Sequence, residues 1–66
     1  MSVIIRNGIK YWYQNGVLHR EDGPAIECAN GNKFWFINGN WHRTYGPAVE
    51  LNNGTSACYL NGKLIE

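Results

Sequence analysis

Short runs of alternating apolar and polar residues follow one another along the chain, and glycine or proline separates them. Three Asn-Gly pairs, at 15–16, 38–39 and 61–62, each lie between two such runs. Because Asn-Gly accommodates the positive φ angles of a type I′ turn, this pattern is typical of β-hairpins. The predicted hairpins join residues 10–14 to 17–20, 33–37 to 40–43, and 56–60 to 63–65.

Further turns lie between these hairpins. Asn30-Gly31 and Asn53-Gly54 each precede an aromatic strand. Gly23-Pro24 and Gly46-Pro47 interrupt strand pairing, because proline donates no backbone hydrogen bond and restricts the residue before it. No stretch places apolar residues at helical spacing, so the chain is predicted to be all-β, a single antiparallel meander of short strands.

The same features recur every 23 residues without an insertion. The recurring features are Gly8, Gly31 and Gly54, the three Asn-Gly pairs, His-Arg at 19–20 and 42–43, Gly-Pro-Ala at 23–25 and 46–48, and Trp12 with Trp35. Such self-similarity predicts a repeat architecture. We expect one domain of about 2.5 hairpin units: a partial unit at 1–7, units at 8–30 and 31–53, and a partial unit at 54–66.

Alternation within each strand assigns side chains to the two faces of the sheet. Two rows of equivalent apolar residues form the predicted core: Val3 and Ile5 with Ile26, Cys28, Val49 and Leu51, and Leu18 with Trp41 and Leu64.

The aromatic strands are apolar on both faces. One face carries Tyr11, Tyr13, Phe34, Phe36, Ala57 and Tyr59, and the other carries Trp12, Trp35 and Cys58. A single sheet layer of 66 residues can hardly cover both faces, so we expect one of them to meet a partner. The expected state is a homodimer or higher oligomer that buries an aromatic face or joins open edge strands.

The hexapeptides 13–18 (Tyr-Gln-Asn-Gly-Val-Leu) and 36–41 (Phe-Ile-Asn-Gly-Asn-Trp) resemble the aromatic-x-Asn-Gly-x-x core of MORN-type repeats, in particular the variant form with a Tyr-Tyr-x-Asn-Gly core. The longer string at 12–25, with its His-Arg-x-x-Gly-Pro-Ala end, is similar to repeats of uncharacterised phage, bacterial and large-virus proteins. The resemblance covers nearly the whole chain. It implies one β-hairpin per unit and a role in interaction or scaffolding, and it carries no catalytic residue over to this chain.

Charge and length narrow the classes of partner. The chain has 66 residues and a net charge of +1, which gives no electrostatic reason to expect a nucleic-acid polymer or a membrane surface as partner. No apolar run approaches the length of a membrane span. The start at 1–6 lacks the features of a signal peptide, so we predict a cytoplasmic location, in the host cytoplasm if the protein is viral.

The two His-Arg pairs are the polar groups that most suggest a site. Equivalent residues of stacked units lie roughly 10 Å apart, and two arginines at that spacing can hold a phosphate or carboxylate between them. Tryptophans 12 and 35 can flank a base. The candidate binding residues are therefore Tyr11, Trp12, Tyr13, His19, Arg20, Phe34, Trp35, Phe36, His42 and Arg43.

The sequence favours a structural role for the same residues. Arg20 can pair with Glu21, Asp22 or Glu27, and Arg43 with Glu50, as ties between units. Each histidine can donate a hydrogen bond to a loop carbonyl at the Gly-Pro bend, and the tryptophans can belong to a core or a subunit interface.

Catalytic and metal-binding patterns are not found in the sequence. No serine, cysteine or histidine falls in a nucleophile motif, the carboxylates are spread along the chain, and Cys28 and Cys58 have no ligand partners at metal spacing. We therefore expect no enzyme, cofactor or metal. The leading hypothesis is a non-catalytic protein-interaction module. One form of this hypothesis is a phage- or mobile-element-encoded accessory factor that docks on a host protein. The alternatives are an oligomer that sequesters an anionic metabolite or signalling nucleotide, and a structural scaffold.

Overall fold

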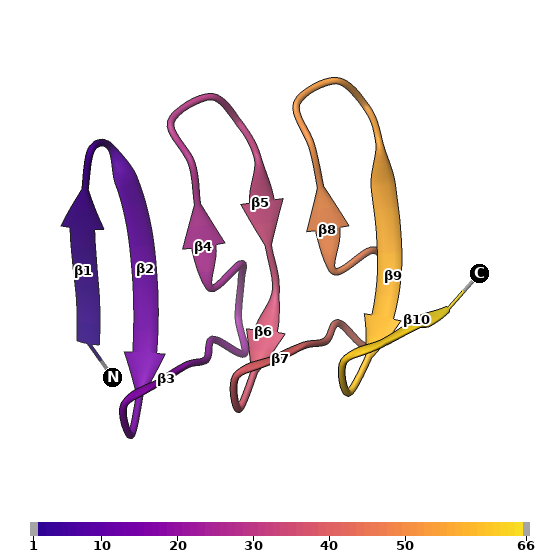
Figure 1. Ribbon diagram of the computed structural model, residues 1–66, viewed down its shortest axis with the longest axis horizontal. Coiled ribbons are helices and arrows are strands. Elements are labelled where there is room, and N and C mark those ends of the chain that lie inside the picture. Colours follow the sequence, from indigo (N-terminus) through magenta and orange to yellow (C-terminus); the bar gives the residue numbers. More distant parts are fainter. Residues whose placement is uncertain (1, 66) are drawn as a thin grey trace.

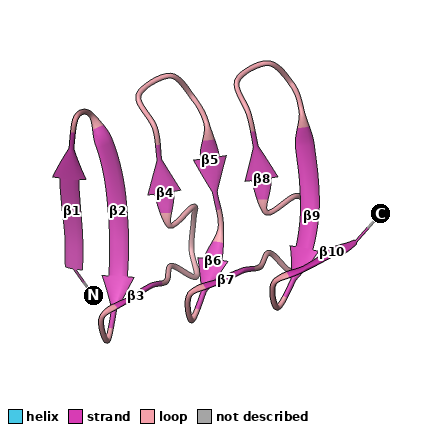
Figure 2. Ribbon diagram, viewed as in Figure 1, coloured by secondary structure: helices cyan, strands magenta, loops and turns pink. Residues whose placement is uncertain are grey.

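The computed structural model describes residues 2–65, and strands and turns account for all of its regular structure (Figure 1). These residues contain no helix, and so none that could cross a membrane (Figure 2). The all-β prediction is confirmed. In chain order the strands are β1 (Ser2–Arg6), β2 (Ile9–Gln14), β3 (Val17–Leu18), β4 (Ile26–Glu27), β5 (Lys33–Phe34), β6 (Phe36–Ile37), β7 (Asn40–Trp41), β8 (Val49–Glu50), β9 (Ser56–Leu60) and β10 (Lys63–Ile65).

The main sheet is antiparallel and has the order β1-β2-β4-β5-β8-β9-β10, with β3 paired to β2. Strands β6 and β7 form a separate pair. The upright strands stand in one row, with β1 and β10 at its opposite ends, and the hairpin turns that follow β2, β6 and β9 lie at its lower edge (Figure 1). The molecule measures 31 × 26 × 16 Å along its principal axes.

The Asn-Gly hairpins form as the sequence predicts. Asn15 and Gly16 have φ angles of 53° and 79°, and the pairs at 38–39 and 61–62 also have positive φ at both residues. These values fit the type I′ turn, which joins two antiparallel strands through two residues. The resulting hairpins are β2–β3, β6–β7 and β9–β10.

A loop leaves the sheet after the β2–β3 hairpin and another after the β6–β7 hairpin. The two ends of each loop lie beside a single strand residue. The Trp12 carbonyl accepts a hydrogen bond from His19 N–H (3.1 Å), and the Trp12 N–H donates to the Ala25 carbonyl (2.8 Å). Residues 20–24, here called the first loop, therefore begin and end at one residue of β2. Trp35 holds His42 and Ala48 at the same two distances, and residues 43–47 form the second loop.

The first hairpin, β1–β2, has a different register from its counterparts. Ile4 faces Tyr11, whereas Ile26 and Val49, 23 residues apart, face Phe34 and Ala57. The expectation that Val3 takes the place of Ile26 is therefore wrong by one residue. A one-residue shift moves every side chain of a strand to the other face, so Val3 lies on the Trp12 side.

The shift originates in the turn. Asn7 and Gly8 both have positive φ (51° and 78°), so β1 and β2 are joined by a two-residue type I′ turn. In the next unit only Gly31 has positive φ, and Cys28 N–H donates to the Asn32 carbonyl across a three-residue loop. The extra loop residue accounts for the change of register.

The core is small and centres on Trp41. Its ring lies 5.6 Å from Phe34, 5.0 Å from Phe36 and 5.3 Å from Tyr59, measured between ring centroids. Among the described residues the buried apolar side chains are Phe36, Pro24, Ala25 and Ala48.

Three members of the predicted core are exposed. Val3 (50%), Ile5 (62%) and Leu64 (57%) face solvent, because they lie on the terminal strands, where no neighbouring unit covers them. The other members, Leu18, Ile26, Cys28, Trp41, Val49 and Leu51, are half-buried.

Candidate functional site

The two histidines tie each unit to the next. His19 is buried, and its Nδ1 accepts a hydrogen bond from the backbone N–H of Asn38 (2.9 Å). A neutral ring that accepts at Nδ1 carries its proton on Nε2, which lies 3.2 Å from Glu21 Oε2. His42 Nδ1 accepts from Asn61 N–H (3.0 Å) in the same way.

This finding corrects the expected partner of the histidines. Each imidazole accepts a hydrogen bond from the following Asn-Gly turn instead of donating to a carbonyl at the Gly-Pro bend. Each contact joins one hairpin to the next and so helps to hold adjacent hairpins in place.

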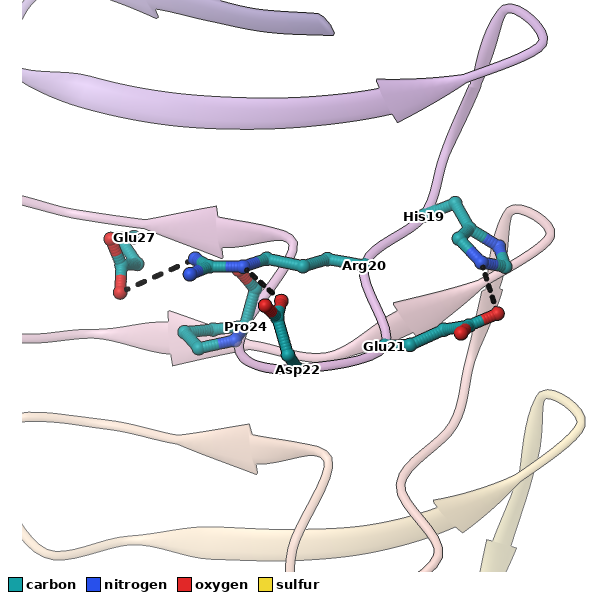
Figure 3. Close-up of polar contacts among 6 residues, drawn as sticks. All are labelled: His19, Arg20, Glu21, Asp22, Pro24 and Glu27. Carbon is teal, nitrogen blue, oxygen red and sulfur yellow. Dashed lines mark hydrogen bonds and ion pairs between the residues drawn. The ribbon is translucent and has the colours of Figure 1, made fainter. Parts of the chain in front are cut away.

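The Arg20 side chain contacts four residues of its own unit, and Figure 3 draws three of them: Asp22, Pro24 and Glu27. Its guanidinium carbon is 4.0 Å from the centre of the Trp12 ring. Nε donates to Asp22 Oδ1 (3.1 Å), and one terminal nitrogen donates to the Pro24 carbonyl (3.1 Å) and lies 3.8 Å from Glu27 Oε2. The positive charge is thus matched by two carboxylates.

Arg43 repeats most of this arrangement. Its guanidinium carbon is 3.8 Å from the centre of the Trp35 ring, and a terminal nitrogen donates to the Pro47 carbonyl (3.1 Å) and to Glu50 (3.3 Å). No acidic residue occupies the place of Asp22, because Tyr45 stands there.

Glycine leaves room for the guanidinium groups beside the loop backbone. A Cβ atom at Gly23 would lie 2.9 Å from Cζ of Arg20, and one at Gly46 would lie 3.2 Å from Cζ of Arg43. Each guanidinium therefore lies between an indole ring and a glycine backbone. This explains the Gly of the Gly-Pro pair by close approach, in addition to turn chemistry.

An open groove of about 690 Å³ lies between the first and second loops. The apolar residues that line it are Trp35 and Ile37, and the second loop contributes Tyr45, which is 87% exposed. The first loop contributes Glu21 and Asp22, whose side chains are 78% and 85% exposed. The remaining lining residues are Arg20, Gly23, His42, Arg43 and Thr44.

The groove brings together four of the residues that the sequence suggested: Arg20, Trp35, His42 and Arg43. Trp12 and His19 lie outside it, in the contacts described above. Tyr11 and Tyr13 alternate with Trp12 along β2 and so face the other side of the sheet, and Phe34 and Phe36 pack on Trp41 there.

Sequence reasoning missed the other six groove residues: Glu21, Asp22, Gly23, Ile37, Thr44 and Tyr45. A signal for four of them was present: the two units agree at His-Arg and Gly-Pro-Ala but differ between them, with Glu-Asp in one and Thr-Tyr in the other. Positions that vary between otherwise matching units are not required for the structure that the units share, and they are candidates for binding.

Neither cysteine forms a disulfide, and the described residues hold no group of three or more His, Cys, Asp or Glu side chains placed to bind a metal ion. The chain matches no protein-family model, no curated protein and no solved structure.

Proposed function

We propose that the chain is a non-catalytic protein-interaction module that binds a short segment of a partner protein in the groove between the first and second loops. The observation that carries the proposal is Tyr45, a large aromatic side chain left 87% exposed at the rim of a groove with apolar residues in its lining. Tyrosine and arginine are enriched at protein interfaces because they combine large contact area with polar groups.

The charges of the groove indicate which segment fits. Glu21 and Asp22 are the most exposed charged groups of its lining, whereas Arg20 and Arg43 are already paired with carboxylates and with loop carbonyls. A lysine or arginine of the partner would therefore meet the first loop. An apolar or aromatic neighbour in the same segment would lie against Ile37 and Tyr45.

A role as a phage- or mobile-element-encoded accessory factor that docks on a host protein is the form of this proposal that the resemblance to phage repeats supports. The groove supports the docking part of it, and the resemblance alone supports the origin.

Capture of a small anion is the second candidate. It is favoured by one observation, that Arg20 and Arg43 line the same groove. Both guanidinium groups are engaged, however, and Glu21 and Asp22 would repel an anion at the same place. The balance of charge therefore favours a basic protein segment.

Selection of binding peptides from a random display library on the immobilised chain tests the proposal. We expect enriched peptides to combine a basic residue with an aromatic or aliphatic one. Replacement of Tyr45 by alanine should weaken their binding at least tenfold, and Asp22→Asn should weaken it less.

The matched control is Val17→Ala, which also shortens an exposed apolar side chain but lies in β3, outside the groove. This variant should bind the peptides as the parent does. Failure to enrich any peptide, or equal binding by Tyr45→Ala, would contradict the proposal. Tight binding of inorganic phosphate that is lost in an Arg20→Ala/Arg43→Ala variant would favour anion capture instead.

A further inference from the structure

Several strand edges of the main sheet have no strand partner among residues 2–65, and two of them belong to β1 and β9. One is the outer edge of β1, and the other is the edge of β9 at Ser56 and Ala57, beyond the part that β10 covers. The two edges lie at opposite ends of the row of strands (Figure 1).

The open edge of β9 corresponds to edges of β2 and β5 that are paired inside the sheet. Lys10 and Tyr11 of β2 pair with β4, and Lys33 and Phe34 of β5 pair with β8. Ser56 and Ala57 follow Lys33 and Phe34 at the same 23-residue spacing. The β9 edge therefore lacks a strand of the β4 and β8 kind.

Strand β1 is a strand of that kind. Like β4 and β8, it precedes an Asn-Gly turn and pairs through one edge with the strand that follows the turn. Its own pairing places Ile4 where the corresponding pairing places Ile26. Val3 and Ile5 then correspond to Ala25 and Glu27.

The backbone groups of both edges are oriented for pairing. The N–H and C=O of Trp12 point toward Ala25 and His19, so those of Tyr11 point toward β1. Alternation then directs the N–H and C=O of Val3 and Ile5 outward from β1. By the same alternation, Ser56 and the N–H of Cys58 point outward from β9.

We propose that copies of this chain associate head to tail, with β1 of one copy added antiparallel to the open edge of β9 of another. Ile4 lies opposite Ala57, Ile5 opposite Ser56, and the Cys58 N–H donates to the Val3 carbonyl. Each pairing reproduces an interior one: Ile26 with Tyr11, Glu27 with Lys10, and Ala25 with Trp12.

The side chains at the two open edges differ from those at the interior pairings, and the change on one edge complements the change on the other. Interior edges oppose lysine and glutamate, as in Lys10–Glu27 and Lys33–Glu50. Ser56 and Ile5 replace both members of this pair with uncharged residues, so neither would leave an unpaired charge in the joint.

The sizes of the facing side chains also differ from the interior pairs in a complementary way. Interior edges place a tryptophan beside a fully buried alanine, Trp12 with Ala25 and Trp35 with Ala48. The open edges carry a smaller residue, Cys58, and a larger one, Val3. Val3, Ile4 and Ile5 are 50%, 41% and 62% exposed, and an uncharged, exposed apolar edge strand of this kind is prone to pair with another strand.

A head-to-tail contact joins two different surfaces, so each added copy leaves one edge of each kind free and chains of copies grow with concentration. Sedimentation velocity of the 66-residue chain under reducing conditions should show a series of multiples of 7.5 kDa that shifts upward with concentration. A chain that stays monomeric from micromolar to millimolar concentration overturns the proposal.

Two variants block opposite edges. Ile5→Lys places a charge on the β1 edge, and Ser56→Pro removes an outward N–H from the β9 edge. Each variant alone should be monomeric, whereas their mixture should form a one-to-one dimer that grows no further, because only one intact edge of each kind remains. If Ile5→Lys blocks association and Ser56→Pro does not, two β1 edges pair with each other and the head-to-tail contact is wrong.

A second pair of variants keeps the test decisive if Ser56→Pro does not fold. Cys58→Trp restores the residue that the interior units carry and crowds Val3, so it should raise the Kd of association at least about tenfold. Adding Val3→Ala should recover the association by recreating the tryptophan–alanine pair. Association that ignores Cys58→Trp, or a loss that Val3→Ala does not recover, overturns the proposed register.

Discussion

At the scale of single residues, a few polar side chains hold the loops and hairpins in place, a role that a large apolar core fills in bigger proteins. Each arginine lies between an indole and a glycine and closes its loop onto the Pro carbonyl. Each histidine accepts a hydrogen bond from a backbone N–H of the Asn-Gly turn in the following hairpin. The stability of adjacent units is therefore coupled through a few polar contacts.

Gly23→Ala tests the close approach of the guanidinium. The added Cβ would displace the Arg20 guanidinium, 2.9 Å away, from the Trp12 ring, which should lower the free energy of unfolding by about 1 kcal/mol. In an Arg20→Ala background the same change should cost less than about 0.5 kcal/mol. Urea unfolding of the four proteins of this cycle measures both values, and an equal cost in both backgrounds would show that the glycine is needed for another reason.

His19→Ala should destabilise the protein more than His42→Ala. The first change leaves the Asn38 N–H without an acceptor in a partly buried place, at a cost of about 2 kcal/mol. The Asn61 N–H is exposed, so water can replace the imidazole of His42 and the cost should be less than half as large. Urea midpoints compare the two directly, and a larger loss for His42→Ala would contradict the proposed role of burial.

At the scale of elements, turn chemistry determines the strands. The Asn-Gly hairpins could be predicted because their signal is local, two residues that accept positive φ between alternating runs. The register of β1 could not, because Asn7-Gly8 and Asn30-Gly31 are the same dipeptide in two different turns. The difference in turn length, and with it the face of Val3 and Ile5, follows only from the pairing of whole strands.

The candidate site was predictable in part for a related reason. The sequence pointed to the two His-Arg pairs and their tryptophans, which do lie together at each loop. It did not point to the groove, because the groove forms between two loops that are 23 residues apart and whose middle residues have no common pattern.

Asn7→Ala tests whether the turn determines the register of β1. Alanine disfavours the φ of 51° that Asn7 adopts, so the variant should lose about 1 kcal/mol of stability and populate the three-residue turn. Nuclear Overhauser contacts between the α-protons of Val3 and Trp12, which face each other, should then weaken. Asn7→Asp is the control, because aspartate tolerates positive φ. Unchanged contacts in Asn7→Ala would show that side-chain packing determines the register instead.

At the scale of the whole molecule, the sheet has a single layer, and the described residues contain no large side chain that is fully buried. Stability then depends on the number of interfaces between adjacent units more than on one central core. A short chain of this construction is expected to be marginally stable on its own.

Duplication of residues 31–53 tests this dependence. A second copy placed after residue 53 adds one interface between units and leaves the two ends unchanged, so the thermal midpoint should rise by at least about 5 °C. A glycine-serine insertion of equal length at the same turn is the control and should not raise the midpoint. A lower midpoint for the duplicated protein would show that adjacent units do not stabilise one another.

The attachment of each loop has a consequence for how the protein can change over evolutionary time. Both ends of the first loop bind the backbone of one residue, Trp12, and both ends of the second bind Trp35. Strand pairing therefore depends on the distance between the two ends of a loop and not on the length or sequence of the residues between them. Residues at 21–22 and 44–45 can diversify, or even accept inserted segments, without moving a strand, and a lineage can acquire a new binding preference while its scaffold stays the same.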